Sequence, residues 1–153
     1  MDRKRLFGSG PACFIVGIIL VLIVYYLELL FKIPKIQVSD YLSNLIFIIA
    51  IILALAVMVW GFASLPFKKR GKELITDKAF KYIRHPIYAG FLDFFVFGLG
   101  FYLKSYGILI SGIILIFLCG KMVEKEEKYL IKQFGQKYQD YQKRTKKFIP
   151  WVY

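Results

Sequence analysis

The sequence predicts an all-α integral membrane protein with four transmembrane helices and a C-terminal amphipathic cytoplasmic helix. Three observations lead to this prediction. Hydrophobic residues make up 58% of the 153 residues, they gather in long runs, and most charged residues lie between the runs. A run of about 20 apolar residues crosses the roughly 30 Å hydrocarbon core of a bilayer as an α-helix. A chain of this length is enough for one domain, so residues 1–153 are expected to form a single unit.

The expected spans are residues 11–31, 41–67, 86–103 and 105–120, and the amphipathic helix is expected over residues 121–143. Arg3, Lys4 and Arg5 precede the first run as they would in a signal peptide, but this run is too long and lacks a clear cleavage site. The third and fourth spans are rich in glycine, which lets membrane helices approach closely, so they are expected to pack as a hairpin. Cys13 and Cys119 lie in apolar runs and are interpreted as small buried residues.

The distribution of Lys and Arg predicts the orientation. Of the 22 basic residues, 19 lie in the N-terminal segment, the loop of residues 68–84 and the tail from Lys121. The two loops at the opposite ends of the spans contain only Lys32, Lys35 and Lys104. Because cytoplasmic loops carry an excess of basic residues, both termini and the 68–84 loop are expected in the cytoplasm.

The formal net charge of +12 fits two kinds of partner, nucleic acid or an anionic membrane surface. The long apolar runs favour membrane lipids, and neither an RNA-binding aromatic signature nor a soluble nucleotide-binding pattern is present. No nucleic acid is therefore expected as a partner. The sequence contains no His/Cys set with metal-ligand spacing, so no metal is expected. The terminal FIPWVY segment suits the membrane interface.

The segment RHPIYAG at residues 84–90 opens the third span and contains the only histidine. Proline suits the first position of a helix, so Pro86 is expected to begin one with His85 at its cap. His85 and Tyr88 would then share a first turn, whose free N–H groups and dipole suit an anionic group. The alternative is a simple cap with an interfacial Arg84–Tyr88 anchor pair, and these residues alone leave both interpretations open.

Three acidic residues need partners. Asp93 lies inside the third span, where a carboxylate is costly; it is a functional candidate, although a structural hydrogen bond to a neighbouring helix is slightly favoured. Glu126 lies on the apolar side of the expected tail helix, where an unpaired carboxylate is unfavourable. Its alternative is a surface salt bridge to Lys121 or Lys125. Glu127 is rotated about 100° around the helix and is expected to matter less.

Two blocks, ITDKAFKYIRHPIYAG at 75–90 and EKEEKYLIKQFGQKYQDYQKRTKKFIP at 124–150, resemble the isoprenylcysteine carboxyl methyltransferase and phospholipid methyltransferase superfamily. The resemblance covers residues 72–150, about half of the chain. Its members are membrane enzymes that use S-adenosylmethionine. The resemblance implies cofactor-binding blocks at 72–90 and 121–150, and methyl transfer at the cytoplasmic membrane boundary. The lipophilic acceptor is left open among a prenylcysteine-type carboxylate, a lipid amine and a thiol.

Carried over by position, the resemblance implies that Tyr88 and Glu126 are catalytic. It also implies that the cofactor contacts Lys72, Glu73, Leu74, Ile75, Phe80, His85, Pro86, Ile87, Tyr88 and Glu126. The chain departs from the family pattern at Phe80, which replaces a usual Tyr. It also departs at Met122, which replaces an arginine that faces the substrate carboxylate in the prenylcysteine enzymes, and Lys121 or Lys125 are the candidate substitutes.

Two other functions compete with methyl transfer. The first is an NADPH-dependent membrane reductase of the sterol-reductase type, for whose extra spans and ribose-phosphate contacts this short chain has little room. The second is a non-catalytic membrane adaptor with a basic tail. Methyl transfer from a sulfonium requires mainly that nucleophile and methyl be held in line, so neither a catalytic triad nor a metal is needed.

Overall fold

A computed structural model describes residues 10–66 and 72–149. The predictions that concern Arg3, Lys4 and Arg5, residues 68–71 and the chain after residue 149 lie outside the described residues. The regular elements of the described part are all helical, with one isolated parallel bridge between Ile83 and Lys146. The all-α prediction is confirmed.

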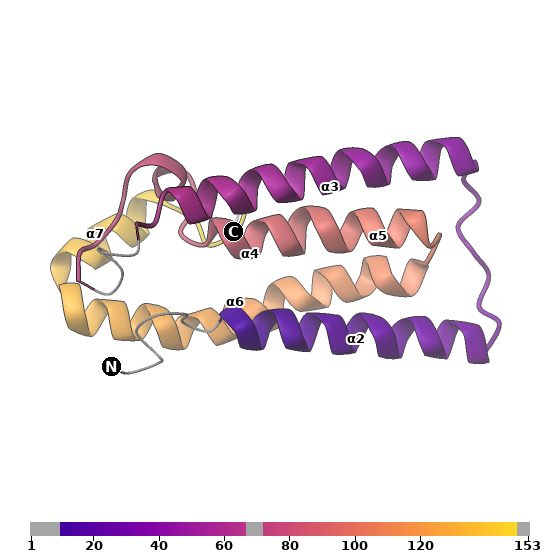
Figure 1. Cartoon of the computed structure of the whole chain (residues 1–153). Helices are drawn as coiled ribbons and strands as arrows, with labels where there is room; N and C mark the ends of the chain where they lie inside the picture. The colour runs from indigo at the N-terminus through magenta and orange to yellow at the C-terminus, as the bar shows by residue number, and fades with distance from the viewer. Residues whose placement is uncertain (1–9, 67–71, 150–153) are drawn as a thin grey trace.

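Three long helices, a composite helix and a short last helix form the described part of the fold. The long helices are α2 (Gly10–Leu30), α3 (Asp40–Ala63) and α6 (Tyr106–Phe134), and the last helix is α7 (Gln136–Arg144). Between α3 and α6 come the 3₁₀ helix η1 (Lys78–Lys81), then α4 (Pro86–Ala89), the π-helical η2 (Gly90–Val96) and α5 (Phe97–Tyr102). Figure 1 shows α2, α3, α6 and the α4–α5 segment running along a common direction, with α7 at one end.

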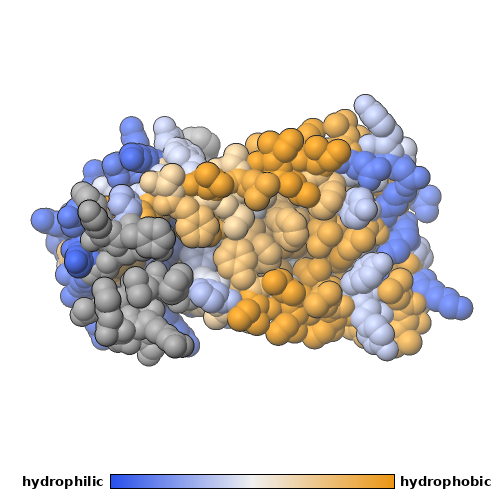
Figure 2. Space-filling view, viewed as in Figure 1, coloured by the Kyte–Doolittle hydropathy of each residue, from blue (hydrophilic) through white to orange (hydrophobic). Residues whose placement is uncertain are grey.

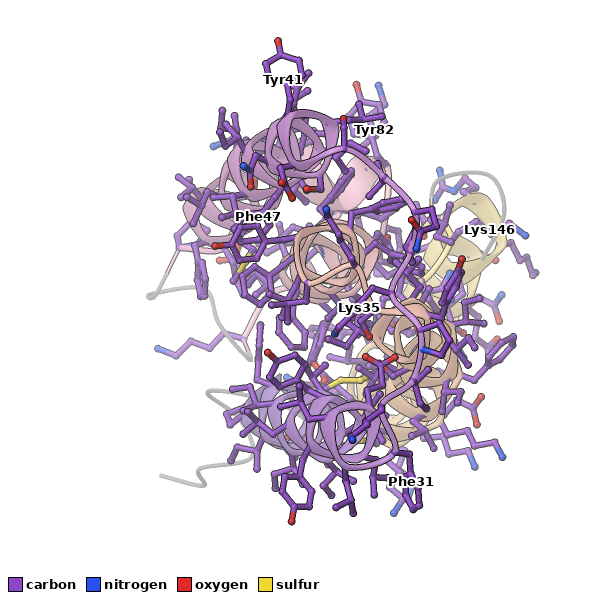
Figure 3. The ribbon with its side chains drawn as sticks, turned by 90° about the vertical axis from the view of Figure 1, so that its right-hand side faces the viewer. Phe31, Lys35, Tyr41, Phe47, Tyr82 and Lys146 are labelled. Carbon is purple, nitrogen blue, oxygen red and sulfur yellow. A yellow bond between two sulfur atoms is a disulfide. The ribbon has the colours of Figure 1, made fainter. Side chains whose placement is uncertain are left out.

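The surface of this bundle requires an apolar solvent. Figure 2 shows hydrophobic residues as a band across the middle and hydrophilic residues at both ends. Figure 3 looks along the bundle, and Phe31 and Tyr41, which are 69% and 78% exposed, point outward from it. Helices α2, α3 and α6 are long and apolar enough to cross a membrane, whereas the apolar helix Pro86–Tyr102 is shorter. The protein is therefore an integral membrane protein with three candidate spans, and the fourth span stays a prediction.

The composite helix is packed between α3 and α6. A Cβ added at Gly90 would lie 2.8 Å from the backbone carbonyl oxygen of Ala54 and 2.5 Å from Cγ of Met58. Only glycine allows η2 and α3 to approach this closely. On the other side, the composite helix packs against α6 as the predicted hairpin. The core between the helices includes Leu92, Val96, Ile108, Leu115 and Val123.

Two predicted helix boundaries are wrong. Helix α3 ends at Ala63 rather than at residue 67, and the Ser64 hydroxyl donates a hydrogen bond to the Trp60 carbonyl at 2.7 Å. The fourth span and the tail helix are not separate, since α6 continues without a break to Phe134. The break comes at Gly135, whose φ of 57° favours glycine. Residues 121–134 therefore extend α6, and only residues 136–144 form a separate helix.

The two cysteines form a disulfide rather than two independent buried residues. Cys13 of α2 and Cys119 of α6 are both buried, as expected, but their sulfur atoms are bonded and their Cα atoms lie 5.7 Å apart. The two positions are separated by 106 residues, so their spacing in the sequence gave no sign of the pairing. The disulfide ties the first helix to the last long helix.

Polar contacts tie together the end of the bundle opposite α7. Glu28 is only 5% exposed, and its Oε1 accepts a hydrogen bond from the Gly107 N–H at 2.8 Å. Ser105 Oγ accepts another from the Ile108 N–H at 2.9 Å. These acceptors satisfy N–H groups that have no partner within the first turn of α6.

Candidate functional site

The RHPIY turn adopts the predicted geometry. Pro86 is the first residue of α4 and His85 is its N-cap. The His85 carbonyl accepts the Ala89 N–H at 3.0 Å, which closes the first turn. His85 and Tyr88 are buried, at 6% and 8% exposure, and their rings meet edge to face with centroids 5.4 Å apart. The first turn therefore presents two polar rings inside the protein.

Glu127 is the centre of a buried polar network. Its Oε1 accepts a hydrogen bond from Arg84 Nε at 2.6 Å and lies 3.3 Å from His85 Nε2, and its Oε2 accepts from Gln142 Nε2 at 3.1 Å. The residue is only 5% exposed. A buried carboxylate is tolerated when donors surround it in this way. The network joins the RHPIY turn to both α6 and α7.

Glu126 lies beside this network and contacts the turn directly. The Tyr88 hydroxyl donates a hydrogen bond to Glu126 Oε2 at 3.2 Å. The order of burial differs from the prediction, because Glu127 is buried and Glu126 is only half-buried. The face of α6 that carries Glu127 packs inward, which the periodicity of the tail alone did not resolve. Glu126 is therefore the glutamate with an accessible side.

Arg84 is not an interfacial anchor. Its side chain is 9% exposed, and besides Glu127 it donates hydrogen bonds from Nη1 to the Gln142 carbonyl at 3.2 Å and to the Thr145 carbonyl. The anchor alternative for Arg84 is thus wrong, because the guanidinium points into the protein. Its several donors match the carboxylate and the two carbonyls at the end of α7.

A groove of about 560 Å³ lies between the segment after residue 71 and the α6–α7 junction. It is lined by Lys72, Glu73, Leu74, Thr76, Phe134, Lys137, Asp140, Tyr141 and Arg144. Three of the predicted cofactor contacts therefore line it, whereas His85, Tyr88 and Glu126 do not. The Arg84–Glu127 network connects the groove with the RHPIY turn. Arg84 donates a hydrogen bond to the carbonyl of Gln142, which directly follows the groove residue Tyr141.

Two tyrosines of α7 anchor it to the rest of the site. The Tyr141 hydroxyl donates to the Phe80 carbonyl at 2.6 Å, which joins η1 to α7. Burial raises the pKa of the Tyr141 phenol above its ordinary value. Burial, reinforced by the negative charge of Glu127, also raises the pKa of the Tyr138 phenol. Both side chains therefore remain neutral phenols at ordinary pH.

Other predicted residues lie away from the Tyr88–Glu126 contact. Pro86 and Ile87 face α3, where a Cβ added at Gly61 would lie 3.1 Å and 3.0 Å from their side chains. Phe80 contributes its carbonyl to the α7 contact. Ile75 is half-buried outside the residues that line the groove. Met122 packs against the hydrophobic core. The predicted set is therefore divided between the turn, the groove and the α3 interface.

Asp93 lies in the π-helical segment η2. Within the described residues, its buried Oδ1 has no hydrogen-bond partner, so the expected structural hydrogen bond is absent at that oxygen. The part of the chain that the structure describes also has no cluster of His, Cys, Asp and Glu residues that could hold a metal ion.

Sequence reasoning missed Phe148 as a component of the site. Its side chain is fully buried rather than interfacial, and its ring centroid lies 6.1 Å from that of His85 and 6.2 Å from that of Tyr88. The terminal segment contains several aromatic residues, and periodicity cannot single out one of them. The available signal was that Phe148 directly precedes Ile149, a second apolar residue after a run of cations.

Comparison with known proteins places this site in a family of membrane enzymes. A sequence model of the isoprenylcysteine carboxyl methyltransferase family matches residues 42–132, which include the RHPIY turn and both glutamates. The match covers more than half of the chain, so the protein belongs to this family.

Two curated relatives are both called protein-S-isoprenylcysteine O-methyltransferase. The one from Schizosaccharomyces pombe is 31% identical over 97 residues, which are 60% of this chain and 40% of the relative. The one from Dictyostelium discoideum is 30% identical over 86 residues, which are 56% of this chain and 36% of the relative. The matched region thus spans about two fifths of the length of these relatives.

Proposed function

We propose that this protein transfers the methyl group of S-adenosylmethionine to a lipophilic acceptor, with an isoprenylcysteine carboxylate as the favoured acceptor. The observation that carries the proposal is the Tyr88–Glu126 contact at 3.2 Å beside the buried Glu127 network. These residues lie in the region that matches the family. The names of the two relatives favour the isoprenylcysteine carboxylate over a lipid amine or a thiol.

The residues of the site fit S-adenosylmethionine chemically. Glu126 offers a carboxylate to an ammonium, a sulfonium or ribose hydroxyls, and such charge-assisted hydrogen bonds are strong. The groove between residues 72–76 and α7 has a volume of about 560 Å³ and mixes apolar with charged side chains, as a site for a nucleoside requires. The bound cofactor supplies an electrophilic methyl group. Glu126 and the groove would hold its two ends.

The chain's own residues act by positioning rather than by acid–base chemistry. Tyr88 orients the Glu126 carboxylate through its hydroxyl, and the Arg84–Glu127 network fixes the turn that carries Tyr88. Fixed orientation can lower the barrier of a bimolecular transfer by up to roughly 7–11 kcal/mol. The apolar faces of α2 and α3 lie open to the bilayer, from which a lipophilic acceptor would enter. The excess of Lys and Arg in the loop of residues 68–84 and in the tail supports a reaction on the cytoplasmic side.

Calorimetry with purified full-length protein tests the proposal. We expect S-adenosylmethionine to bind the wild type, and His85→Ala and Tyr88→Phe to weaken binding while leaving the protein folded. A hydrogen bond to a charged group contributes about 1.5–3 kcal/mol, so Tyr88→Phe should lower the affinity by about tenfold or more. The matched control is Tyr102→Phe. The Tyr102 ring stacks on that of Phe47, with centroids 4.5 Å apart, away from the site.

An acceptor assay with a radiolabelled methyl donor completes the test. Labelling of an isoprenylcysteine peptide is expected, whereas labelling of lipid amines or thiols alone would assign a different acceptor. Thermal stabilisation by NADPH but not by S-adenosylmethionine would replace the proposal with the reductase. Stabilisation by neither compound would favour the membrane adaptor. Unchanged affinity in both site variants would leave the RHPIY turn as a simple helix cap.

A further inference from the structure

The last described segment, residues 145–149, runs beside the residues that lead into the RHPIY turn; we call it the C-terminal strap. Its backbone accepts two hydrogen bonds, from the Arg84 N–H to the Lys146 carbonyl at 2.8 Å and from the His85 N–H to the Lys147 carbonyl at 3.1 Å. Ile83 and Lys146 form the parallel bridge at the same place. The strap therefore fixes the backbone of His85 directly.

The strap is also attached to α6. Lys147 Nζ donates to Glu124 Oε1 at 3.2 Å and to the Gly120 carbonyl at 3.4 Å, and this side chain is only 15% exposed. Gly120 and Glu124 lie within two turns of Glu126 on the same helix. The strap thus touches both parts of the site, the RHPIY turn and the segment of α6 that carries the glutamates.

Phe148 adds a side-chain constraint to these backbone contacts. Its fully buried ring completes a triangle with the rings of His85 and Tyr88, with centroid separations of 6.1, 6.2 and 5.4 Å. The Tyr88 hydroxyl also donates a hydrogen bond to Glu126. A shift of the Phe148 ring would therefore free both rings of the turn to move relative to Glu126.

We propose that Phe148 is a positioning residue, and that the C-terminal strap sets the distance between the RHPIY turn and the glutamates of α6. The importance of Phe148 for catalysis rests on the proposed methyl transfer, whereas its effect on the position of His85 does not. The region that matches the family model ends at residue 132, before the strap begins. Only the fold brings Phe148 back to His85.

The test compares Phe148→Leu with the control Ile108→Val. Both changes trim a fully buried apolar side chain, and Ile108 lies in the first turn of α6 at the opposite end of the bundle. His85 is the only histidine, so its imidazole gives one resolved set of NMR signals at fixed pH. We expect Phe148→Leu to shift these signals and to lower kcat, since misplacement by about 1 Å can cost up to about 100-fold. Ile108→Val should change neither.

The outcomes separate the positioning role from the proposed function. If Phe148→Leu lowers the melting temperature but leaves the imidazole signals and kcat as in Ile108→Val, Phe148 is only a core residue and the inference is overturned. If the signals also shift in Lys147→Met, which removes no aromatic ring, but the wild type binds no S-adenosylmethionine, the positioning role stands and the methyl transfer fails. If Phe148→Leu does not fold, Lys147→Met serves instead. It removes the attachment to α6 and should shift the same signals, and unchanged signals would overturn the inference.

Discussion

At residue 127 a single carboxylate holds three parts of the chain. Arg84 and His85 approach Glu127 from the RHPIY turn, and Gln142 approaches it from α7. Removing one partner of a buried charged pair leaves the other charge without compensation, which is costly. The two adjacent glutamates therefore differ in their surroundings: Glu127 is held in the buried network, and Glu126 is the glutamate proposed to contact the cofactor.

This difference predicts that substitution of Glu127 mainly lowers stability and that substitution of Glu126 mainly lowers cofactor binding. Glu127→Gln should lower the free energy of unfolding by about 3–5 kcal/mol, because it leaves Arg84 without its buried anion. Glu126→Gln should cost only about 1 kcal/mol, because the amide oxygen still accepts the hydrogen bond from Tyr88 and only the assistance of the charge is lost, but it should abolish S-adenosylmethionine binding. Thermal unfolding in detergent and calorimetry measure the two effects. Equal melting temperatures for the two variants would contradict the assignment.

The sequence was enough to locate these residues but not to rank them. The RHPIY turn and the pair of glutamates could be selected from motif and periodicity, and Pro86 begins its helix as expected. Which glutamate is buried depends on the rotation of α6 by about 100° per residue against its neighbours. That rotation is set by packing contacts with η2 and α2, which sequence periodicity does not contain.

At the scale of elements, the close contact between η2 and α3 decides how the RHPIY turn is held. Gly90 begins η2, four residues after Pro86, and leaves no room for a side chain against the Ala54 carbonyl. A backbone atom cannot move aside as a flexible side chain can. Any side chain at residue 90 would thus push the composite helix away from α3.

We therefore expect Gly90→Ala to destabilise the protein by about 1–3 kcal/mol, the usual cost of overpacking a tight interface. The matched control is Gly112→Ala on the hairpin partner, where an added Cβ meets only side-chain atoms of Phe97 and Val96, at 3.1 to 3.3 Å. Melting temperatures of both variants check this expectation. A larger loss for Gly112→Ala than for Gly90→Ala would show that backbone contact at η2 is not limiting.

Helix existence was easier to predict than helix ends. Apolar runs identified α2, α3 and the hairpin, but the change from apolar to basic residues near Lys121 was taken for a helix boundary. A helix keeps its backbone hydrogen bonds where its surroundings change from apolar to aqueous. Helix α6 therefore continues beyond Lys121 to Phe134. The real boundary needs a residue that leaves helical φ and ψ, and Gly135 provides it.

At the scale of the whole molecule, the distribution of charge predicts the orientation in the membrane. The excess of Lys and Arg predicts that Lys35 lies outside and that Lys146 lies in the cytoplasm. Figure 1 shows the connection between α2 and α3, which contains Lys35, at the end of the bundle opposite α7, and the exposed Lys146 follows α7. The two native cysteines are joined in a disulfide, so introduced thiols would be labelled against a low background.

Cysteine variants at these two positions should react differently with a membrane-impermeant maleimide added to intact cells. Lys35→Cys should be labelled at once, and Lys146→Cys only after the membrane is permeabilised. Lys69, also expected in the cytoplasm, lies outside the described residues. Labelling of both positions from the same side would rule out an orientation with four spans.

Contacts between distant parts of the chain explain most of what the sequence could not predict. The disulfide, the Glu28–Gly107 contact and the strap each join segments more than 60 residues apart. Local patterns record which residues prefer an apolar surrounding, but they do not record which neighbour provides it. The hairpin followed from local patterns, while the partners of Arg84 and Cys13 required the fold.

The strap also has a consequence for the biosynthesis of the protein. Phe148 is made 63 residues after His85. At a synthesis rate of about 5–20 residues per second, this separation amounts to about 3 to 13 s. During that interval the ribosome has already delivered the RHPIY turn, but not the segment that holds it. The chain would therefore become competent for the proposed cofactor only after Phe148 has been made, and nascent chains halted before residue 145 should be unable to bind this cofactor.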